Sequence, residues 1–196
     1  LEKVNDKAEL LISQISESKS KNEANEAINR LFSSDAGSNL KSEGRKVALL
    51  KLAEISEEDN RVEESQQYLA EYLKRYPEDP MIPIVLLRQG SLYRKMGAYD
   101  LERQKYFDTI KAASKVNFQS GKYDLDYVKR VILISRSQIA ESFFAEAILT
   151  KNKLNQYSLH NFTNCYIATK NTNHFLENNI DPKWKLISVP DDCDTW

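Results

Sequence analysis

The sequence predicts an all-α fold, an α-solenoid of antiparallel helix pairs, and three observations support this. The chain of 196 residues contains only 5 glycines and 5 prolines, too few for a turn-rich β-sandwich or barrel. Strong helix formers, chiefly Leu, Ala, Glu, Lys and Gln, dominate its first three quarters. Apolar residues recur there at helical spacing, in segments that come in pairs.

Helical periodicity predicts the individual elements in order. The first helix is expected over residues 1–18, with Leu11 and Ile15 on its apolar face. The others are expected at 24–31, 40–55, 62–76, 84–95, 99–116 and 124–150. The segment PEDPMIP holds three of the five prolines and must separate the helices on either side of it.

The predicted helix pairs also repeat. A small or short residue precedes a large one by four positions on the second helix of each pair, with steps of 38 and 37 residues between pairs. The matching positions are Ala27 with Leu31, Ser65 with Leu69, and Glu102 with Tyr106. One such pair cannot bury its apolar face alone, so neighbouring pairs are expected to stack.

The stretch RQGSLYRKMGAYD and the helix after it resemble the tetratricopeptide repeat family. The resemblance rests on Gly90, Tyr93, Gly97, Tyr99 and Tyr106 at offsets 8, 11, 15, 17 and 24 of the repeat. Glu102 stands where the family usually has alanine. The preceding unit follows the pattern more loosely, with Ala53, Val62, Leu69 and Pro77.

The turn Tyr76-Pro77-Glu78-Asp79-Pro80 narrows the resemblance. It is similar to the Tyr-Pro-x-x-Pro turn of bacterial envelope proteins whose prototype is the BamD outer-membrane assembly lipoprotein. This implies a periplasmic or outer-membrane-associated protein, with a cytoplasmic location as the alternative. The chain opens on Leu1 rather than Met, so a lipid anchor upstream of it is compatible with the sequence.

The two glycines of this stretch favour helix packing over ligand binding. A phosphate loop requires Gly-x-x-x-x-Gly-Lys-Ser/Thr after a strand, and GSLYRKMG has neither that spacing nor a following lysine. We expect Gly90 to allow close helix contact and Gly97 to adopt a positive φ just after a helix end. The tyrosines are expected to fill the space between the helices.

Composition and motifs predict a non-enzymatic protein without cofactors. The net charge of −1 and pI of about 6.2 provide no field that would attract nucleic acid. No apolar run approaches the roughly 18 residues of a membrane span, and no local catalytic motif is present. His160, Cys165, His174 and Cys193 lack the short paired spacing of zinc ligands.

The family resemblance implies that the first helix of each pair lines a groove for a protein or peptide partner. The candidate groove residues are Glu54, Glu57, Arg88, Ser91, Arg94, Lys95, Glu141 and Phe144, with Glu58 beside them. The acidic residues of one unit and the basic residues of the next either pair with each other or remain available. In the second case Arg94 and Lys95 are expected to point outward and to bind a carboxylate or an acidic peptide.

The sequence divides into a divergent helix pair at 1–40, tetratricopeptide-like repeats at 41–150 and a distinct tail at 151–196. The tail is Asn-rich, with poor helical period, and is a divergent cap, a poorly ordered segment or an artefactual end. The predicted function is that of a non-enzymatic scaffold for protein–protein interaction. The alternatives are a regulatory or docking part of a larger enzyme or transport protein and, third, a helical protein at a membrane surface, based on residues 124–150.

Overall fold

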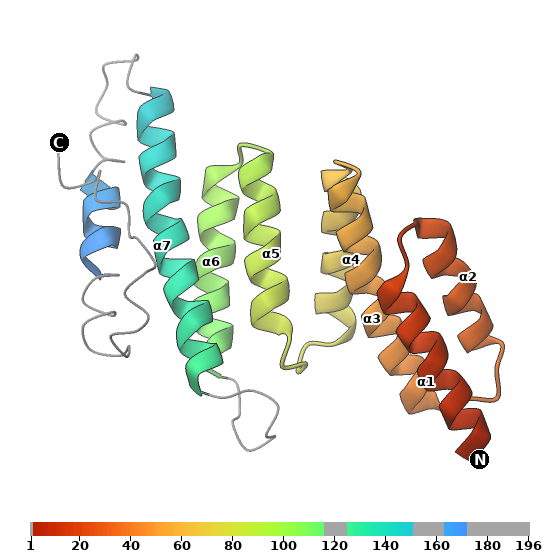
Figure 1. Ribbon diagram of the computed structural model, residues 1–196. Helices are drawn as coiled ribbons and strands as arrows, with labels where there is room; N and C mark the ends of the chain where they lie inside the picture. Colours follow the sequence, from red (N-terminus) through yellow and green to blue (C-terminus); the bar gives the residue numbers. More distant parts are fainter. Residues whose placement is uncertain (1, 116–124, 151–162, 172–196) are drawn as a thin grey trace. The chain divides into compact units, whose positions relative to one another are not determined.

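The computed structural model describes residues 2–115, 125–150 and 163–171, and all regular secondary structure among them is α-helical (Figure 1). This confirms the predicted fold class, an all-α array of helix pairs. The chain divides into two compact units, residues 1–77 and 78–196, and each is described by itself. The boundary falls at Pro77, within the proline-rich segment that the sequence identifies as a break.

The first unit contains four helices in the order of the chain. They are α1 (Glu2–Glu17), α2 (Lys21–Phe32), α3 (Ser38–Glu58) and α4 (Val62–Arg75). Helices α1, α2 and α3 pack against one another, and α4 packs against α3. Ser20 begins α2 as its N-cap, because its hydroxyl accepts a hydrogen bond from the backbone N–H of Glu23 at 3.3 Å.

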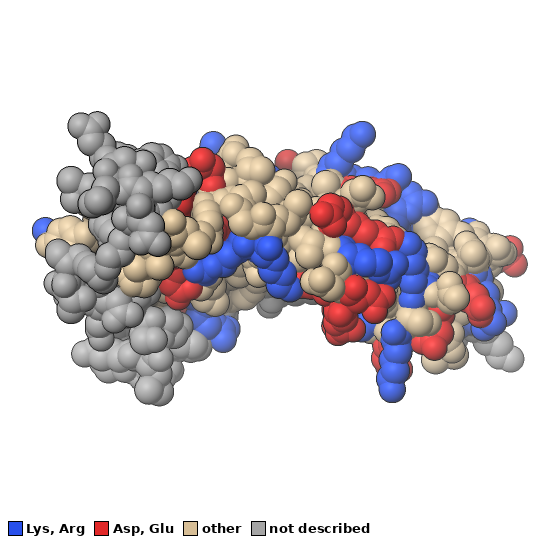
Figure 2. All heavy atoms as spheres, turned by 90° about the horizontal axis from the view of Figure 1, so that it is seen from above, with Lys and Arg blue, Asp and Glu red and all other residues tan. Residues whose placement is uncertain are grey.

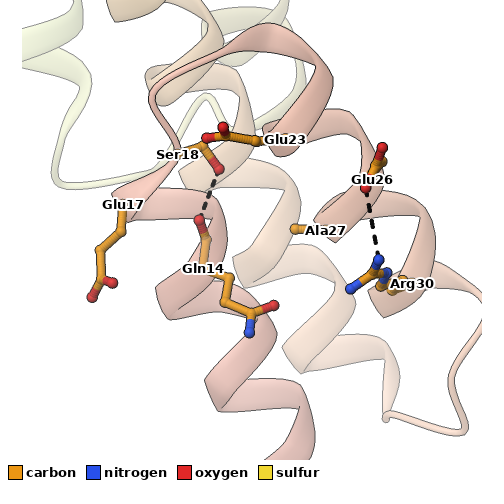
Figure 3. A pocket seen from close by; sticks show the side chains of 7 residues that line it. All are labelled: Gln14, Glu17, Ser18, Glu23, Glu26, Ala27 and Arg30. Atoms are coloured by element: carbon orange, nitrogen blue, oxygen red, sulfur yellow. Dashed lines mark hydrogen bonds and ion pairs between the residues drawn. The ribbon is translucent and has the colours of Figure 1, made fainter.

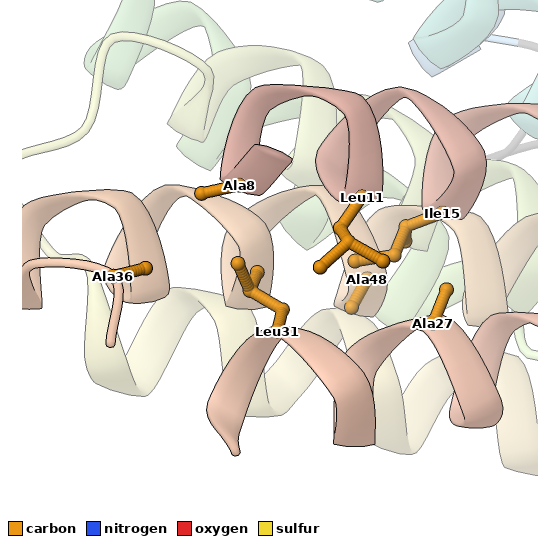
Figure 4. Packing of buried hydrophobic residues seen from close by; sticks show 7 residues of the cluster. All are labelled: Ala8, Leu11, Ile15, Ala27, Leu31, Ala36 and Ala48. Atoms are coloured by element: carbon orange, nitrogen blue, oxygen red, sulfur yellow. The ribbon is translucent and has the colours of Figure 1, made fainter. Parts of the chain in front are cut away.

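The core between α1, α2 and α3 consists of aliphatic residues and alanine. Figure 4 shows Leu11 and Ile15 of α1 directed toward Leu31 of α2 and Ala48 of α3, all of them buried. Burying one Leu or Ile side chain contributes about 1.5–3 kcal/mol. The small alanines, together with Gly44 of α3 beside Leu31, allow these helices to approach closely.

The second unit contains α5 (Ile82–Lys95), α6 (Tyr99–Ala113), α7 (Leu125–Thr150) and a helix over 163–171. Helix α5 packs along α6, and α7 packs mainly on α6. Gly90 of α5 lies against the ring of Tyr106 of α6, where a Cβ atom would come within 2.5 Å of the ring. Gly90 is therefore a helix-contact residue, as the sequence predicts.

Two equivalent turns close the helix pairs of the repeats. Gly97, between α5 and α6, has φ = 71°, and Asn60, 37 residues earlier, has φ = 59°. In each turn the following residue donates its N–H to a carbonyl five positions back, Ala98 to Tyr93 and Arg61 to Ser56. This is the hydrogen-bond pattern of a helix C-cap in which one residue adopts the left-handed (αL) conformation. The predicted positive φ of Gly97 is confirmed.

Burial supports the repeat that the sequence predicts. All six residues of the matching positions are buried, namely Ala27, Leu31, Ser65, Leu69, Glu102 and Tyr106. The pattern therefore tracks the inner face of the second helix in each pair.

Helix α7 is buried on more than one side. Leu133 and Ser135 are both buried although they project from nearly opposite sides of the helix, because each residue turns about 100°. No helix of the described residues is long and apolar enough to cross a membrane. Most of the predicted tail, 151–196, lies outside the described residues, including both tryptophans.

Candidate interaction surface

The predicted groove residues of the second unit lie on α5 and α7. Ser91 and Lys95 are exposed on α5, whereas Arg88 and Arg94 are half-buried. Phe144, on α7, is half-buried as well. The exposed part of the predicted surface in this unit therefore centres on Ser91 and Lys95.

Arg94 does not point freely outward, in contrast to the sequence prediction. Its Nη1 atom donates hydrogen bonds to Gln138 Oε1 at 2.6 Å and to Glu141 Oε2 at 2.9 Å, and its side chain is 30% exposed. Arg94 thus binds a carboxylate, as expected of it, but that carboxylate is supplied by α7 of the same unit. Two predicted site residues, Arg94 and Glu141, are paired with each other.

Behind Arg94 lies Glu102 of α6, whose side chain is 0% exposed. Its Oε2 atom accepts a hydrogen bond from Ser142 Oγ at 2.8 Å, and its Oε1 atom lies 3.6 Å from Arg94 Nε. Oε1 has no hydrogen-bond partner among the described residues. Burial raises the pKa of Glu102, while the hydrogen bond from Ser142 and the charges of Arg94 and Arg103 act in the opposite direction.

Arg103 completes this buried charge network from the next position of α6. Its Nη1 atom donates to Glu146 Oε2 at 2.8 Å, and its Nη2 atom donates to Asp100. The guanidinium also stacks over the ring of Phe143, 4.3 Å from the ring centroid, and the side chain is only 7% exposed. Arg103 therefore connects α6 to α7 through charge, hydrogen bonding and stacking.

The charge network, Arg94, Glu102, Arg103, Glu141, Ser142 and Glu146, is buried at Glu102, Arg103 and Ser142 and partly exposed elsewhere, and it connects the helices. Its carboxylates are occupied by arginines or by Ser142, and Glu102 is closed to solvent. A reactant could not reach Glu102 without separating α6 from α7. Among the residues that the structure describes, no group of three His, Cys, Asp or Glu side chains could hold a metal ion.

The acidic part of the predicted groove lies on α3, in the first unit. Glu54 is paired with Lys51 at 3.1 Å, Glu57 is half-buried, and Glu58 is exposed. Figure 2 shows Lys and Arg side chains interspersed with Asp and Glu among the described residues. Exposed ion pairs of this kind contribute little to stability.

The first unit also carries an open acidic cleft of about 340 Å³ between α1 and α2 (Figure 3). Glu17, Glu23 and Glu26 line it, with Glu26 3.7 Å from Arg30. Ser18 closes its inner side by donating a hydrogen bond to the carbonyl oxygen of Gln14 at 2.8 Å. These carboxylates are solvated side chains around a local turn.

A second cleft, which the sequence did not predict, lies where α2 and α4 end and α3 begins. It has a volume of about 410 Å³ and is lined by Phe32, Ser38, Lys41, Ser42, Arg45, Arg75 and Tyr76. Three of these seven residues are cationic. The start of α3 carries the signal that could have revealed it, because its first turn contains no acidic residue and its N-cap is Gly37, which offers no capping side chain.

These features define the class of the protein as an all-α helical-repeat protein. Within it, residues 47–79 are similar to the family model described as a tetratricopeptide repeat. The match covers the later part of α3, all of α4 and the turn that follows. No curated protein and no solved structure matches the chain significantly.

The family match, residues 47–79, falls on the repeat unit that follows the sequence pattern more loosely, rather than on the stretch around Gly90. The position of Glu102 offers a physical reason. It places a charged side chain where the repeat usually has alanine, and α7 supplies the partners that make this tolerable.

Proposed function

We propose that the protein is a non-catalytic scaffold that binds a protein or peptide partner on its repeats. The observation that carries this proposal is the tetratricopeptide repeat at residues 47–79, because repeats of this family generally mediate protein–protein interaction. Further helices lie on both sides of that segment. In the second unit the partner contacts Ser91 and Lys95 on α5, with Arg88 and Phe144 nearby.

The structure changes how this surface should be tested. Reversing the charge of Arg94 would break its contacts with Glu141 and Gln138, so a lost interaction could reflect lost packing. Ser91→Glu together with Lys95→Glu alters exposed positions of α5 instead. Gln104→Glu together with Lys111→Glu makes the same changes of charge at exposed positions of α6 and is the matched control.

The experiment compares the two double variants in affinity capture from an extract of the source organism. A partner held by α5 should be recovered with wild type and the α6 control but reduced at least several-fold with the α5 variant. Equal recovery with all three proteins would overturn the assignment of α5. Circular dichroism should show the same helix content in each variant.

We further propose placement in the cell envelope, in the periplasm or at the outer membrane. The turn at 76–80 supports it through its resemblance to envelope proteins. A second support is that Cys165, buried in the helix over 163–171, is disulfide-bonded, since disulfides persist in oxidising compartments. Alkylating thiols in acid-quenched cells should leave Cys165 unmodified unless a reductant is added, whereas modification without reductant would contradict this placement.

A further inference from the structure

We propose that the cleft between the ends of α2 and α4 and the start of α3 binds acidic side chains of a peptide segment of the partner. The inference rests on the scaffold function proposed above and assigns it a second, chemically defined contact in the first unit. We call this the basic cleft, and its lining residues are those given above.

Two of the cations in the basic cleft have no anionic partner among the described residues. Lys41 has no ion pair in the described part of the chain. Arg45 likewise has no ion pair within the described ranges, and its guanidinium carbon lies over the face of Phe32, 4.7 Å from the ring centroid. Arg75, by contrast, is paired with Glu71 at 2.7 Å and lies in the last turn of α4, where a cation is favourable for the helix alone.

The position of Lys41 and Arg45 on α3 makes this arrangement unusual. Lys41 lies at the end of the first turn of a helix of 21 residues, near the positive end of its dipole, and Arg45 lies one turn further on. The first turn carries no acidic residue, and Gly37 supplies no cap. A cation at Lys41 is unfavourable for the helix by itself, so a bound anion would relieve this repulsion and engage unsatisfied N–H groups at the helix start.

The remaining walls of the basic cleft favour a peptide over a small ion. Phe32 and Tyr76 provide aromatic surface, and Tyr76 is held in place because its hydroxyl donates to the carbonyl oxygen of Ser42 at 3.3 Å. Lys46 lies over the ring of Tyr76, 5.2 Å from its centroid. The cleft volume of about 410 Å³ is larger than a single small ion requires.

The probe is a short synthetic peptide of Asp, Glu and Leu carrying a fluorophore, and binding to the full chain is followed by anisotropy. The same peptide with Asn and Gln in place of Asp and Glu is the uncharged control. We expect the acidic peptide to bind and the neutral one not to. Binding should weaken as salt is raised, because partly exposed charges are screened.

The variant that tests the site is Lys41→Gln with Arg45→Gln. It should weaken acidic-peptide binding by roughly tenfold, since each charge-assisted contact contributes about 1 kcal/mol or less at an exposed site. The matched control, Lys7→Gln with Arg30→Gln, makes the same changes at exposed positions of α1 and α2 and should leave binding unchanged. Ser38→Asp should also weaken binding, because it places a carboxylate within the cleft.

The melting temperature of the Lys41→Gln and Arg45→Gln variant distinguishes a binding role of these residues from a purely structural one. If Lys41 and Arg45 only supported the fold, the Gln variant would melt at a lower temperature. If Lys41 and Arg45 serve to bind an anion, the variant without bound peptide should melt at a temperature no lower than that of wild type.

Three results would overturn the proposal: equal binding of both peptides, unchanged binding by the Lys41 and Arg45 variant, or inorganic phosphate at millimolar concentration displacing the peptide with the same residue dependence. The last would assign the cleft to small anions. If peptide binding fails while partner capture still depends on Ser91 and Lys95, the basic cleft is rejected and the scaffold function stands.

Discussion

The two units fill the same position of the repeat with different chemistry. Ser65 in the first unit and Glu102 in the second are 37 residues apart, and both are fully buried. The first unit is held by aliphatic residues and alanine, with ion pairs left at its surface. The second unit instead buries the charge network that connects α5 and α6 to α7.

The difference shows that a repeat fixes where a helix packs but not what holds it. A buried carboxylate is tolerated at the alanine position because α7 brings two polar groups to it, Ser142 directly and Glu141 through Arg94. Without those partners the cost of desolvating Glu102 would be uncompensated. The second unit therefore depends on α7 in a way that the first unit does not depend on any single ion pair.

The largest effect that would test this contrast comes from Arg103→Met. Removing this cation takes a short ion pair away from Glu146 in a largely buried site, which should lower the free energy of unfolding by about 3–5 kcal/mol. Arg30→Met changes an arginine of the first unit that is 68% exposed and should alter stability by no more than about 0.5 kcal/mol. Urea denaturation followed by circular dichroism measures both.

A second variant separates the effect of the charge on Glu146 from the effect of the side-chain volume lost at Arg103. Adding Glu146→Leu to Arg103→Met also removes the carboxylate that has lost its ion pair with Arg103 and should recover part of the lost stability. If Arg103→Met and Arg30→Met have similar effects, the contrast between the units is wrong.

A smaller loss of stability is expected when alanine replaces either of the two glycines that allow close helix contact, Gly90 and Gly44. A Cβ at Gly90 would meet the ring of Tyr106 at 2.5 Å, and a rigid ring cannot move aside easily. Gly90→Ala should therefore cost about 1–2 kcal/mol, an overpacking loss partly offset by better helix propensity.

Gly44 is the matched site in the first unit. A Cβ there would meet Leu31 Cδ2 at 2.1 Å, but that atom is the end of a flexible side chain that can rotate. Gly44→Ala should change the free energy of unfolding by less than Gly90→Ala does. The reverse order in urea denaturation would show that the aliphatic core is the more rigid of the two.

Much of this fold follows from local sequence. The helix ends, the break at the prolines, the contact at Gly90 and the positive φ of Gly97 depend on residues close in the chain. Asn60 has the same left-handed conformation as Gly97, and asparagine is among the few residues that tolerate it. The sequence predicted a turn there, without indicating which residue would adopt that conformation.

The site was less predictable, because its decisive contacts join distant parts of the chain. Arg94 was expected to face outward, yet Gln138 and Glu141 lie 44 and 47 residues further along and hold it. No local pattern states which acidic residues of α7 will face α5. The charge at Glu102, where the repeat has alanine, was the one signal of a buried network.

A pH-dependent effect should follow from Glu102→Gln. Burial raises the pKa of Glu102 above 4.5, so its contribution to stability is fully present below about pH 4.5 and is lost as pH rises through the folded pKa. Glutamine does not titrate, and the stability of the variant should therefore rise relative to that of wild type as pH rises. Glu63→Gln, at an exposed position of α4, is the control and should show no such trend in thermal melts across pH.

The smallest change in stability is expected for a substitution at Glu64 in the first unit. Its dependence on pH should be opposite in sign to that of Glu102→Gln. Lys21 of α2 pairs with Glu64 of α4, and this hydrogen bond is the main cause that lowers the pKa of Glu64 and raises that of Lys21. The contribution of Glu64 is therefore present above about pH 4.5 and lost as pH falls through its lowered pKa. Glu64→Gln should slightly destabilise the protein at neutral pH and have no effect in strong acid or at high salt, because both side chains are partly exposed.

Hydrogen exchange measured across pH would report the local stability of α4 in the Glu64→Gln variant and of α6 in the Glu102→Gln variant. If Glu64→Gln and Glu102→Gln shift stability in the same direction as pH rises, the two units do not differ in how they accommodate charge.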